Sequence, residues 1–145
     1  MRNRIIFLCP HGAAKSMIAA AYCQQLADQW GVPLHVTSAG TEPDAEVAPA
    51  VVTLLRAEGI DVADQRPRRV TAEELAAASC IISMGCDLSD QARPGMPIEH
   101  WNDVPSPSLD LRGAQDRIQN HVEQLVVALK HTKDRASKTG EGMCS

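Results

Sequence analysis

A cysteine, a lysine and a serine lie close together near the start of the chain, in a segment that could hold an anion and attack it. The segment reads Cys9-Pro-His-Gly-Ala-Ala-Lys15-Ser16. Cysteine reacts as its thiolate, which nearby cations and the amino-terminal end of a helix favour. Lys15 supplies a cation, and the small residues allow successive backbone N–H groups to turn toward one anion. Cys9 is the candidate nucleophile; a buried cysteine followed by an ordinary turn is the alternative.

The residues after Cys9 are the candidate anion-binding set, acting mainly through their backbone. They are His11, Gly12, Ala13, Ala14, Lys15 and Ser16. The His11 side chain has two interpretations. When protonated beside Cys9 it would favour the thiolate; it can equally be a loop histidine that faces solvent.

Elements predicted around this loop alternate between strands and helices. Short apolar runs predict strands at residues 4–8, 34–38, 80–84 and 97–100. Helical periodicity and capping signals predict helices at 13–30, 45–58, 71–78 and 109–130. Such alternation predicts an α/β fold: a three-layer, four-stranded parallel sheet with helices on both faces. Ligands of these sheets bind beyond the carboxyl ends of the strands, where the Cys9 loop falls.

Composition limits the function classes. With 145 residues, we expect one domain over 1–131 and a disordered tail over 132–145, where little can be buried. A formal charge of −4 and only 3% aromatic residues argue against nucleic acid as a partner. No apolar run is long enough for a membrane span or a signal peptide, so we expect a cytoplasmic protein. No spacing of His, Cys and carboxylates indicates a metal site.

Several motifs in order along residues 4–130 resemble the low-molecular-weight protein tyrosine phosphatase family, including its thioredoxin-coupled arsenate reductase branch. The first is Phe7-Leu-Cys9 with Lys15-Ser16 in the family's Cys-x5-Arg-Ser/Thr slot. The others are Ser38-Ala-Gly-Thr41, Glu58-Gly-Ile-Asp61, Arg66-Pro-Arg-Arg-Val-Thr71, Ile82-Ser-Met-Gly-Cys86, His100-Trp101, and Asp103 ahead of Pro105.

This resemblance implies roles for individual residues. Cys9 would attack phosphorus or arsenic in line while the loop amides hold the equatorial oxygens, and Ser16 would hydrogen-bond the thiolate. Asp103 would protonate the leaving oxygen, with Asp110 as the fallback; a turn or capping role is the alternative for Asp103. Ser38 would support the Cys9 loop by hydrogen bonds.

Lys15 stands where the family has arginine, and this departure leaves two functions open. Arginine grips two oxygens with a planar fork, whereas lysine is a point charge. By analogy with the loss of an oxyanion-hole donor, the rate would fall by roughly 10²–10³. The first function is a cysteine-dependent hydrolase (phosphatase) or arsenate reductase acting on a phosphate or arsenate oxyanion. The second is a weakly active or inactive relative that binds such anions or senses thiol oxidation.

Cys86 resembles the first resolving cysteine of the arsenate reductases. No second one follows, so an external thiol such as thioredoxin or glutathione would complete the cycle, and no other cofactor is implied. Trp101 is the only ring of the late loop, which favours a small inorganic or aliphatic anion, and we expect it to anchor the fourth strand in the core. We also expect Cys23 in the core. We expect some of the arginines of 66–69 to pair with carboxylates such as Asp64 or Glu73, with substrate binding as the alternative.

Overall fold

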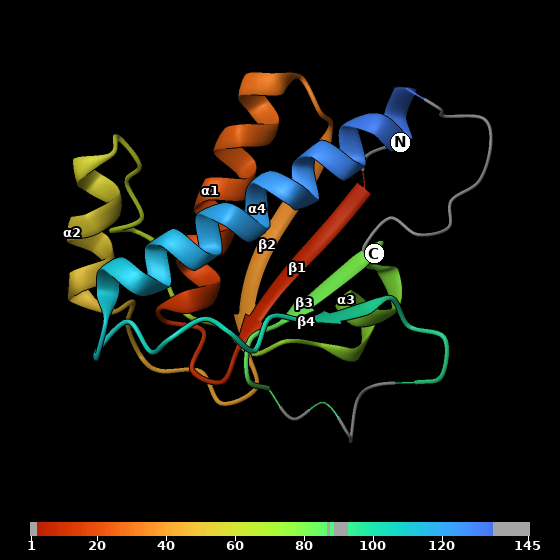
Figure 1. Cartoon of the computed structure of the whole chain (residues 1–145). Helices are drawn as coiled ribbons and strands as arrows, with labels where there is room; N and C mark the ends of the chain where they lie inside the picture. The colour runs from red at the N-terminus through yellow and green to blue at the C-terminus, as the bar shows by residue number, and fades with distance from the viewer. Residues whose placement is uncertain (1–2, 87, 89–92, 135–145) are drawn as a thin grey trace.

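A four-stranded, all-parallel sheet forms the centre of the molecule (Figure 1). The computed structural model describes residues 3–86, 88 and 93–134. Along the sheet the order is β2-β1-β3-β4, with bounds β1 Asn3–Cys9, β2 Leu34–Gly40, β3 Cys80–Ser83 and β4 Ile98–His100. β1 is therefore an inner strand, paired with β2 and β3, and its carboxyl end delivers Cys9 to the sheet edge where ligands bind.

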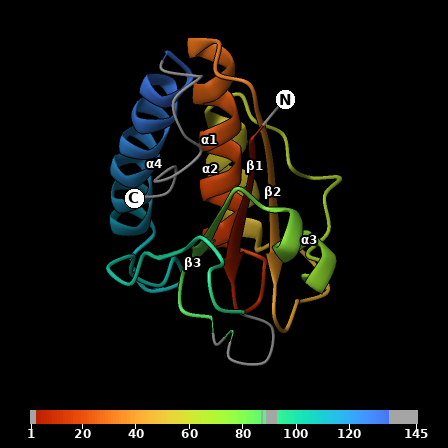
Figure 2. The ribbon, with the colours of Figure 1, turned by 90° about the vertical axis from the view of Figure 1, so that its right-hand side faces the viewer.

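Helices cover both faces of the sheet, as Figure 2 shows. α1 (Lys15–Trp30), α2 (Pro49–Ala57) and α4 (Leu111–Asp134) pack on one face, and α3 (Ala72–Ala77) on the other. Side chains of β1 alternate between the two cores, with Ile5 and Phe7 in the larger and Ile6 and Leu8 in the smaller. This alternation explains why the strand is apolar throughout, and the three-layer α/β prediction is confirmed.

Local signals set two of the helix ends as predicted. α1 stops at Gly31, whose φ of 67° is left-handed and whose N–H bonds the carbonyls of Ala27 and Asp28. α3 starts with a capping box in which the Thr71 hydroxyl accepts from the Glu74 N–H and the Glu74 carboxylate accepts from the Thr71 N–H.

Two predicted boundaries were wrong. The helix expected over 45–58 begins only at Pro49, because the backbone N–H groups of Glu42, Asp44 and Ala48 bond to carbonyls of the Cys9 loop instead of entering a helix. α4 runs to Asp134, into the segment expected to be a disordered tail. The rest of that predicted tail, residues 135–145, lies outside the described residues.

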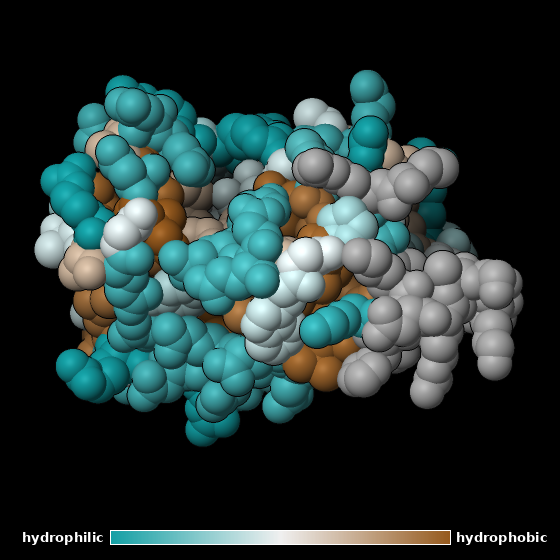
Figure 3. Space-filling view, turned by 90° about the horizontal axis from the view of Figure 1, so that it is seen from above, coloured by the Kyte–Doolittle hydropathy of each residue, from teal (hydrophilic) through white to brown (hydrophobic). Residues whose placement is uncertain are grey.

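The end of the molecule opposite the Cys9 loop is mostly hydrophilic, with smaller apolar areas between (Figure 3). The Lys130 ammonium lies 5.8 Å from the centre of the partly exposed Trp30 ring. Among the described residues, no helix has the length and apolar character needed to cross a membrane.

Candidate active site

The Cys9 sulfur lies at the carboxyl end of β1, only 3% exposed, and is bonded by the first turn of α1. Its thiol donates to Ser16 Oγ at 3.1 Å, and the Ser16 backbone N–H donates to the sulfur at 3.4 Å. Ser16 is fully buried. Once Cys9 loses its proton, the Ser16 hydroxyl can become a second donor, so both groups then stabilise a thiolate. The hydrogen bond between Cys9 and Ser16 is therefore present, and the role of Ser16 toward a thiolate stays a prediction.

Backbone bonds turn the loop's carbonyls away from the sulfur. Three of these carbonyls accept from the segment ahead of α2 at 2.8–3.0 Å: those of Pro10, His11 and Ala13. Within the described part of the chain, no acceptor is recorded for the backbone N–H groups of Ala13, Ala14 and Lys15. Unpartnered N–H groups at the start of a helix are the usual donors to an oxyanion.

A glycine pair fixes how closely the loop approaches β2. Gly12 has a left-handed φ of 62°, and a Cβ on it would lie 3.0 Å from the Gly40 nitrogen. A Cβ on Gly40 would lie 2.8 Å from the Gly12 nitrogen and 2.9 Å from the Pro10 oxygen. Both positions therefore require glycine, since any side chain would push the loop and the strand apart.

A pocket of about 230 Å³ opens above the sulfur. Its lining comes from three parts of the chain: residues 9–11 and 13–15, then Asp44 with Ala48, Ala50 and Val51, and residues 106–108. Lys15 is partly buried in it, which places a cation beside the candidate nucleophile as predicted. Among the described residues that line it, none is Phe, Tyr or Trp. The pocket is suited to a small anion rather than to an aryl group.

A histidine and a carboxylate meet at the pocket's rim. His11 Nδ1 lies 3.2 Å from Asp44 Oδ1, with the side chains 63% and 54% exposed. The Asp44 backbone N–H also donates to the His11 carbonyl at 2.9 Å. His11 therefore faces solvent and Asp44, as in the second of its two interpretations. Sequence reasoning missed Asp44, because no motif marks it and only the fold brings it to the loop.

The chain has recognisable relatives among known proteins. The profile of the family described as "Low molecular weight phosphotyrosine protein phosphatase" matches residues 4–136. The chain belongs to this family. An arsenate reductase of Bacillus subtilis is 30% identical over 106 residues, which is 70% of this chain and 73% of that protein.

Two solved structures show the same family fold. The thioredoxin-dependent arsenate reductase Cg_ArsC1' of Corynebacterium glutamicum is 25% identical, with a TM-score of 0.79 over 90% of this chain; the match spans 63% of that protein. The YwlE arginine phosphatase of Geobacillus stearothermophilus is 20% identical, with a TM-score of 0.78, covering 94% of this chain and 99% of that one. Proteins with this fold thus include both an arginine phosphatase and an arsenate reductase.

The late loop of this family member directs Asp103 away from the pocket. Asp103 Oδ1 lies 2.7 Å from His121 Nε2 and its Oδ2 lies 3.4 Å from Arg117, both on α4. The His121 hydrogen bond, more than any other influence, holds the Asp103 pKa below its usual range. A general acid needs the opposite shift. These contacts favour the structural alternative for Asp103, and its acid role stays a prediction.

The fallback residue, Asp110, is also engaged in structure. Its Oδ1 accepts from the Gly113 N–H at 2.8 Å, which makes it the amino-terminal cap of α4. Trp101, as expected, is a core residue: it is 3% exposed and packs between the rings of Phe7 and His121, at 5.5 and 4.5 Å.

The charge of Cys9 influences the pKa of Cys86. Burial, and next the charge of Cys9, raise the pKa of the Cys86 thiol to about 11. The Cys86 backbone N–H donates to Ser83 Oγ at 3.3 Å, which holds the residue just past β3. Both cysteines lie at the carboxyl ends of neighbouring strands, since Leu8 of β1 pairs with Ser83 of β3, so the fold places them at the same edge of the sheet.

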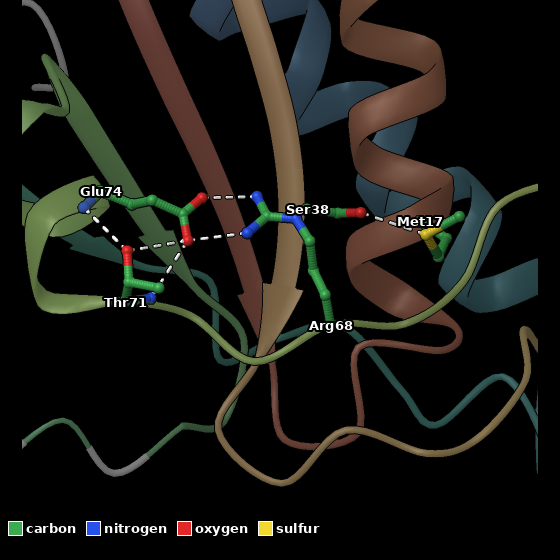
Figure 4. A network of polar contacts seen from close by, with 5 residues as sticks. All are labelled: Met17, Ser38, Arg68, Thr71 and Glu74. Atoms are coloured by element: carbon green, nitrogen blue, oxygen red, sulfur yellow. Dashed lines mark hydrogen bonds and ion pairs between the residues drawn. The ribbon is translucent and has the colours of Figure 1, made fainter.

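Ser38 and the arginine-rich segment have structural partners, shown in Figure 4. The Ser38 hydroxyl donates to Met17 Sδ at 3.1 Å, so it supports the start of α1 rather than bonding the loop itself. The Arg68 guanidinium grips both carboxylate oxygens of Glu74, at 2.7 and 2.5 Å. Arg69 donates to the Thr41 carbonyl at 2.7 Å. The predicted structural role is met, with Glu74 in place of the partners expected for it.

Proposed function

We propose that the chain is a cysteine-dependent enzyme that acts on an oxyanion of phosphorus or arsenic in the Cys9 loop. The observation that carries the proposal is the pairing of the buried Cys9 sulfur with Ser16 at the floor of a small pocket. A thiolate there is the nucleophile, and the amides of residues 13–15 hold the equatorial oxygens. Lys15 balances part of the anion's charge as a single point charge.

Arsenate is the better supported of the two substrates. Cys9 thiolate would displace one oxygen of arsenate, as water after proton transfer, and form a sulfur–arsenic bond. The Cys86 sulfur would then attack the Cys9 sulfur, forming the Cys9–Cys86 disulfide as the sulfur–arsenic bond breaks and its electron pair leaves with arsenic. Arsenic gains two electrons and departs as arsenite, and the two sulfurs lose two. An external dithiol or glutathione-type thiol would reduce the disulfide.

Hydrolysis of a phosphate ester is supported less, because it makes no use of the Cys86 thiol near Cys9. Both reactions need a proton on the departing oxygen, whether it leaves as alkoxide, phenoxide or hydroxide. Asp103 and Asp110 are both engaged with α4, so the late loop offers neither reaction a carboxylic acid.

A second candidate function follows from Lys15. A point charge stabilises a transition state less than a bidentate fork, and the loop would then serve to bind phosphate-like anions or to sense oxidation through Cys9. The same sulfur, amides and pocket serve either function, so reactivity of Cys9 alone does not distinguish them. Turnover does.

The test compares wild type, Cys9→Ser and Lys15→Arg. Each would be assayed on p-nitrophenyl phosphate, and on arsenate with thioredoxin, its reductase and NADPH, or with glutathione. We expect arsenate turnover by wild type and none by Cys9→Ser. Activity that appears only in Lys15→Arg would establish the binding or sensing function instead. Absence of turnover in all three proteins would refute the enzymatic proposal.

A further inference from the structure

The rim of the pocket carries a proton donor that the family resemblance does not place there. Resting on the function proposed above, we infer that His11 is the residue that protonates the leaving oxygen, and that Asp44 is the positioning residue that holds its imidazole. Histidine is the side chain that most readily exchanges protons near neutral pH. A carboxylate behind it is the usual means of fixing ring and tautomer.

In-line attack defines where the proton must be delivered. The nucleophile and the leaving oxygen lie on opposite sides of the central atom, so a leaving oxygen lies on the solvent side when the sulfur is at the floor. Cys9 is 3% exposed, while the side chains of His11 and Asp44, which line the same pocket, are 63% and 54% exposed. His11 is therefore on the side where the leaving oxygen emerges.

The contacts of His11 leave one ring nitrogen for chemistry. Nδ1 faces Asp44 Oδ1 at 3.2 Å, and Nε2 has no bond recorded within the described residues. The backbone bond from Asp44 to the His11 carbonyl, at 2.9 Å, ties the two residues together whatever their side chains do. With the Nδ1–H directed at the Asp44 carboxylate, the proton available for transfer is the one on Nε2.

Other groups that could give up a proton are engaged or unsuited. Asp44 is the only carboxylate in the described lining of the pocket. Asp103 bonds His121 and Arg117, and Asp110 caps α4. Lys15 shares the pocket, where an ammonium beside an anion serves as a charge.

The proton balance of the step is simple. Cys9 thiolate, hydrogen arsenate and the His11 imidazolium give the sulfur–arsenic adduct, one water molecule and neutral His11, as the Nε2 proton moves to the departing oxygen. With a phosphate ester the same transfer releases an alcohol or phenol. Neutral His11 then recovers a proton from the water that hydrolyses the thiophosphate, or from solvent after arsenite leaves.

The experiment uses the full-length chain with His11→Ala and Asp44→Ala, and with His35→Ala and Glu46→Ala as matched controls outside the pocket. Three substrates differ in how strongly their leaving group needs a proton: p-nitrophenyl phosphate, phenyl phosphate, and arsenate with its thiol reductants. Free imidazole is added to each variant. A general acid contributes about 10²–10⁴ in rate, so we expect His11→Ala to lose at least about 10² in kcat on phenyl phosphate or arsenate.

The loss on p-nitrophenyl phosphate, whose leaving group is a stable anion, should be under tenfold. Imidazole should restore much of the lost rate in His11→Ala and none in the controls, and Asp44→Ala should show a smaller loss with the same order of substrates. Two results would overturn the inference while the proposed function stands. One is equal kcat for His11→Ala and His35→Ala. The other is a loss of kcat in His11→Ala that is the same on all substrates and is not restored by imidazole. If wild type turns over arsenate alone, the inference is tested by the loss of arsenate kcat in His11→Ala and by its recovery with imidazole. A wild type silent on every substrate would overturn both.

Discussion

Replacing Gly40 by alanine would separate the Cys9 loop from β2 without touching any group that reacts. The added Cβ would lie 2.8 Å from the Gly12 nitrogen, 2.9 Å from the Pro10 oxygen and 3.0 Å from the His11 carbonyl carbon. Ordinary contact begins near 3.4 Å, so the loop and the strand must move apart by about 0.6 Å. All three neighbours are backbone atoms, so no side chain can swing aside to absorb the contact.

The size of the effect follows from that displacement. Overpacking of a rigid contact costs about 1–3 kcal/mol in folding free energy, which lowers Tm by roughly 4–12 °C for a domain of this size. A misplacement near 1 Å costs about 10² in rate where oriented groups bind a transition state. We therefore expect kcat/KM for arsenate to fall about 10- to 100-fold, with the inhibition constant for phosphate rising in parallel. Differential scanning calorimetry and steady-state kinetics measure the two effects.

Gly59→Ala is the matched control. Gly59 has a φ of 83°, and a Cβ there would meet nothing within 4 Å, so its cost is backbone strain of about 1–2 kcal/mol with no push on the loop. It should lower Tm by a similar amount and leave kcat/KM unchanged. If Gly40→Ala lowers Tm like the control but keeps kcat/KM and phosphate inhibition within twofold of wild type, the reasoning about the loop–strand contact is wrong.

Three further predictions concern charges and thiols away from the pocket. Arg68→Ala should cost about 1 kcal/mol or less at pH 7, since the pair is partly exposed. Because Arg68 lowers the Glu74 pKa from 4.5, that stability is present above about pH 4.5 and lost as the pH falls through the folded value, so urea unfolding of variant and wild type should converge toward pH 3. Asp103→Asn should keep kcat within threefold, whereas loss of a general acid would cost about 10²–10⁴. Burial raises the Cys23 pKa to about 12, so iodoacetamide at pH 8 should label Cys23 only after unfolding, as peptide mass spectrometry would show.

The elements that could be predicted from sequence are those whose signals are local. The continuous apolar run of β1, the glycine that stops α1 and the Thr71–Glu74 box each depend on residues a few positions apart. The start of α2 depends on more. Pro49 at its first position is a local signal, but Glu42, Asp44 and Ala48 also give their N–H groups to a loop more than thirty positions earlier in the chain, and helix propensity contains no information about such partners. The prediction therefore placed the helix four residues too early.

Side-chain roles at the site divide in the same way. The placement of Cys9, Lys15 and Ser16 around one pocket could be predicted, because their spacing on a strand–loop–helix unit fixes how they meet. The contacts of Asp103 could not be predicted from its place near two prolines, since its partner His121 is 18 positions away on another helix. Asp44 carries no motif, and only the backbone bond to His11 brings it to the rim.

The departures at the start of the Cys9 loop are best understood together. Lys15 provides a point charge instead of a bidentate guanidinium, so the backbone amides of residues 13–15 would contribute more of the anion's binding. Those amides are aimed inward because the neighbouring carbonyls are held by the segment ahead of α2, and Gly12 lets the loop lie against Gly40 closely enough for those bonds to form. The same bonds carry Asp44 to His11 at the solvent side of the pocket. One set of backbone contacts thus both shapes the anion site and supplies the carboxylate that a proton donor at its mouth would require.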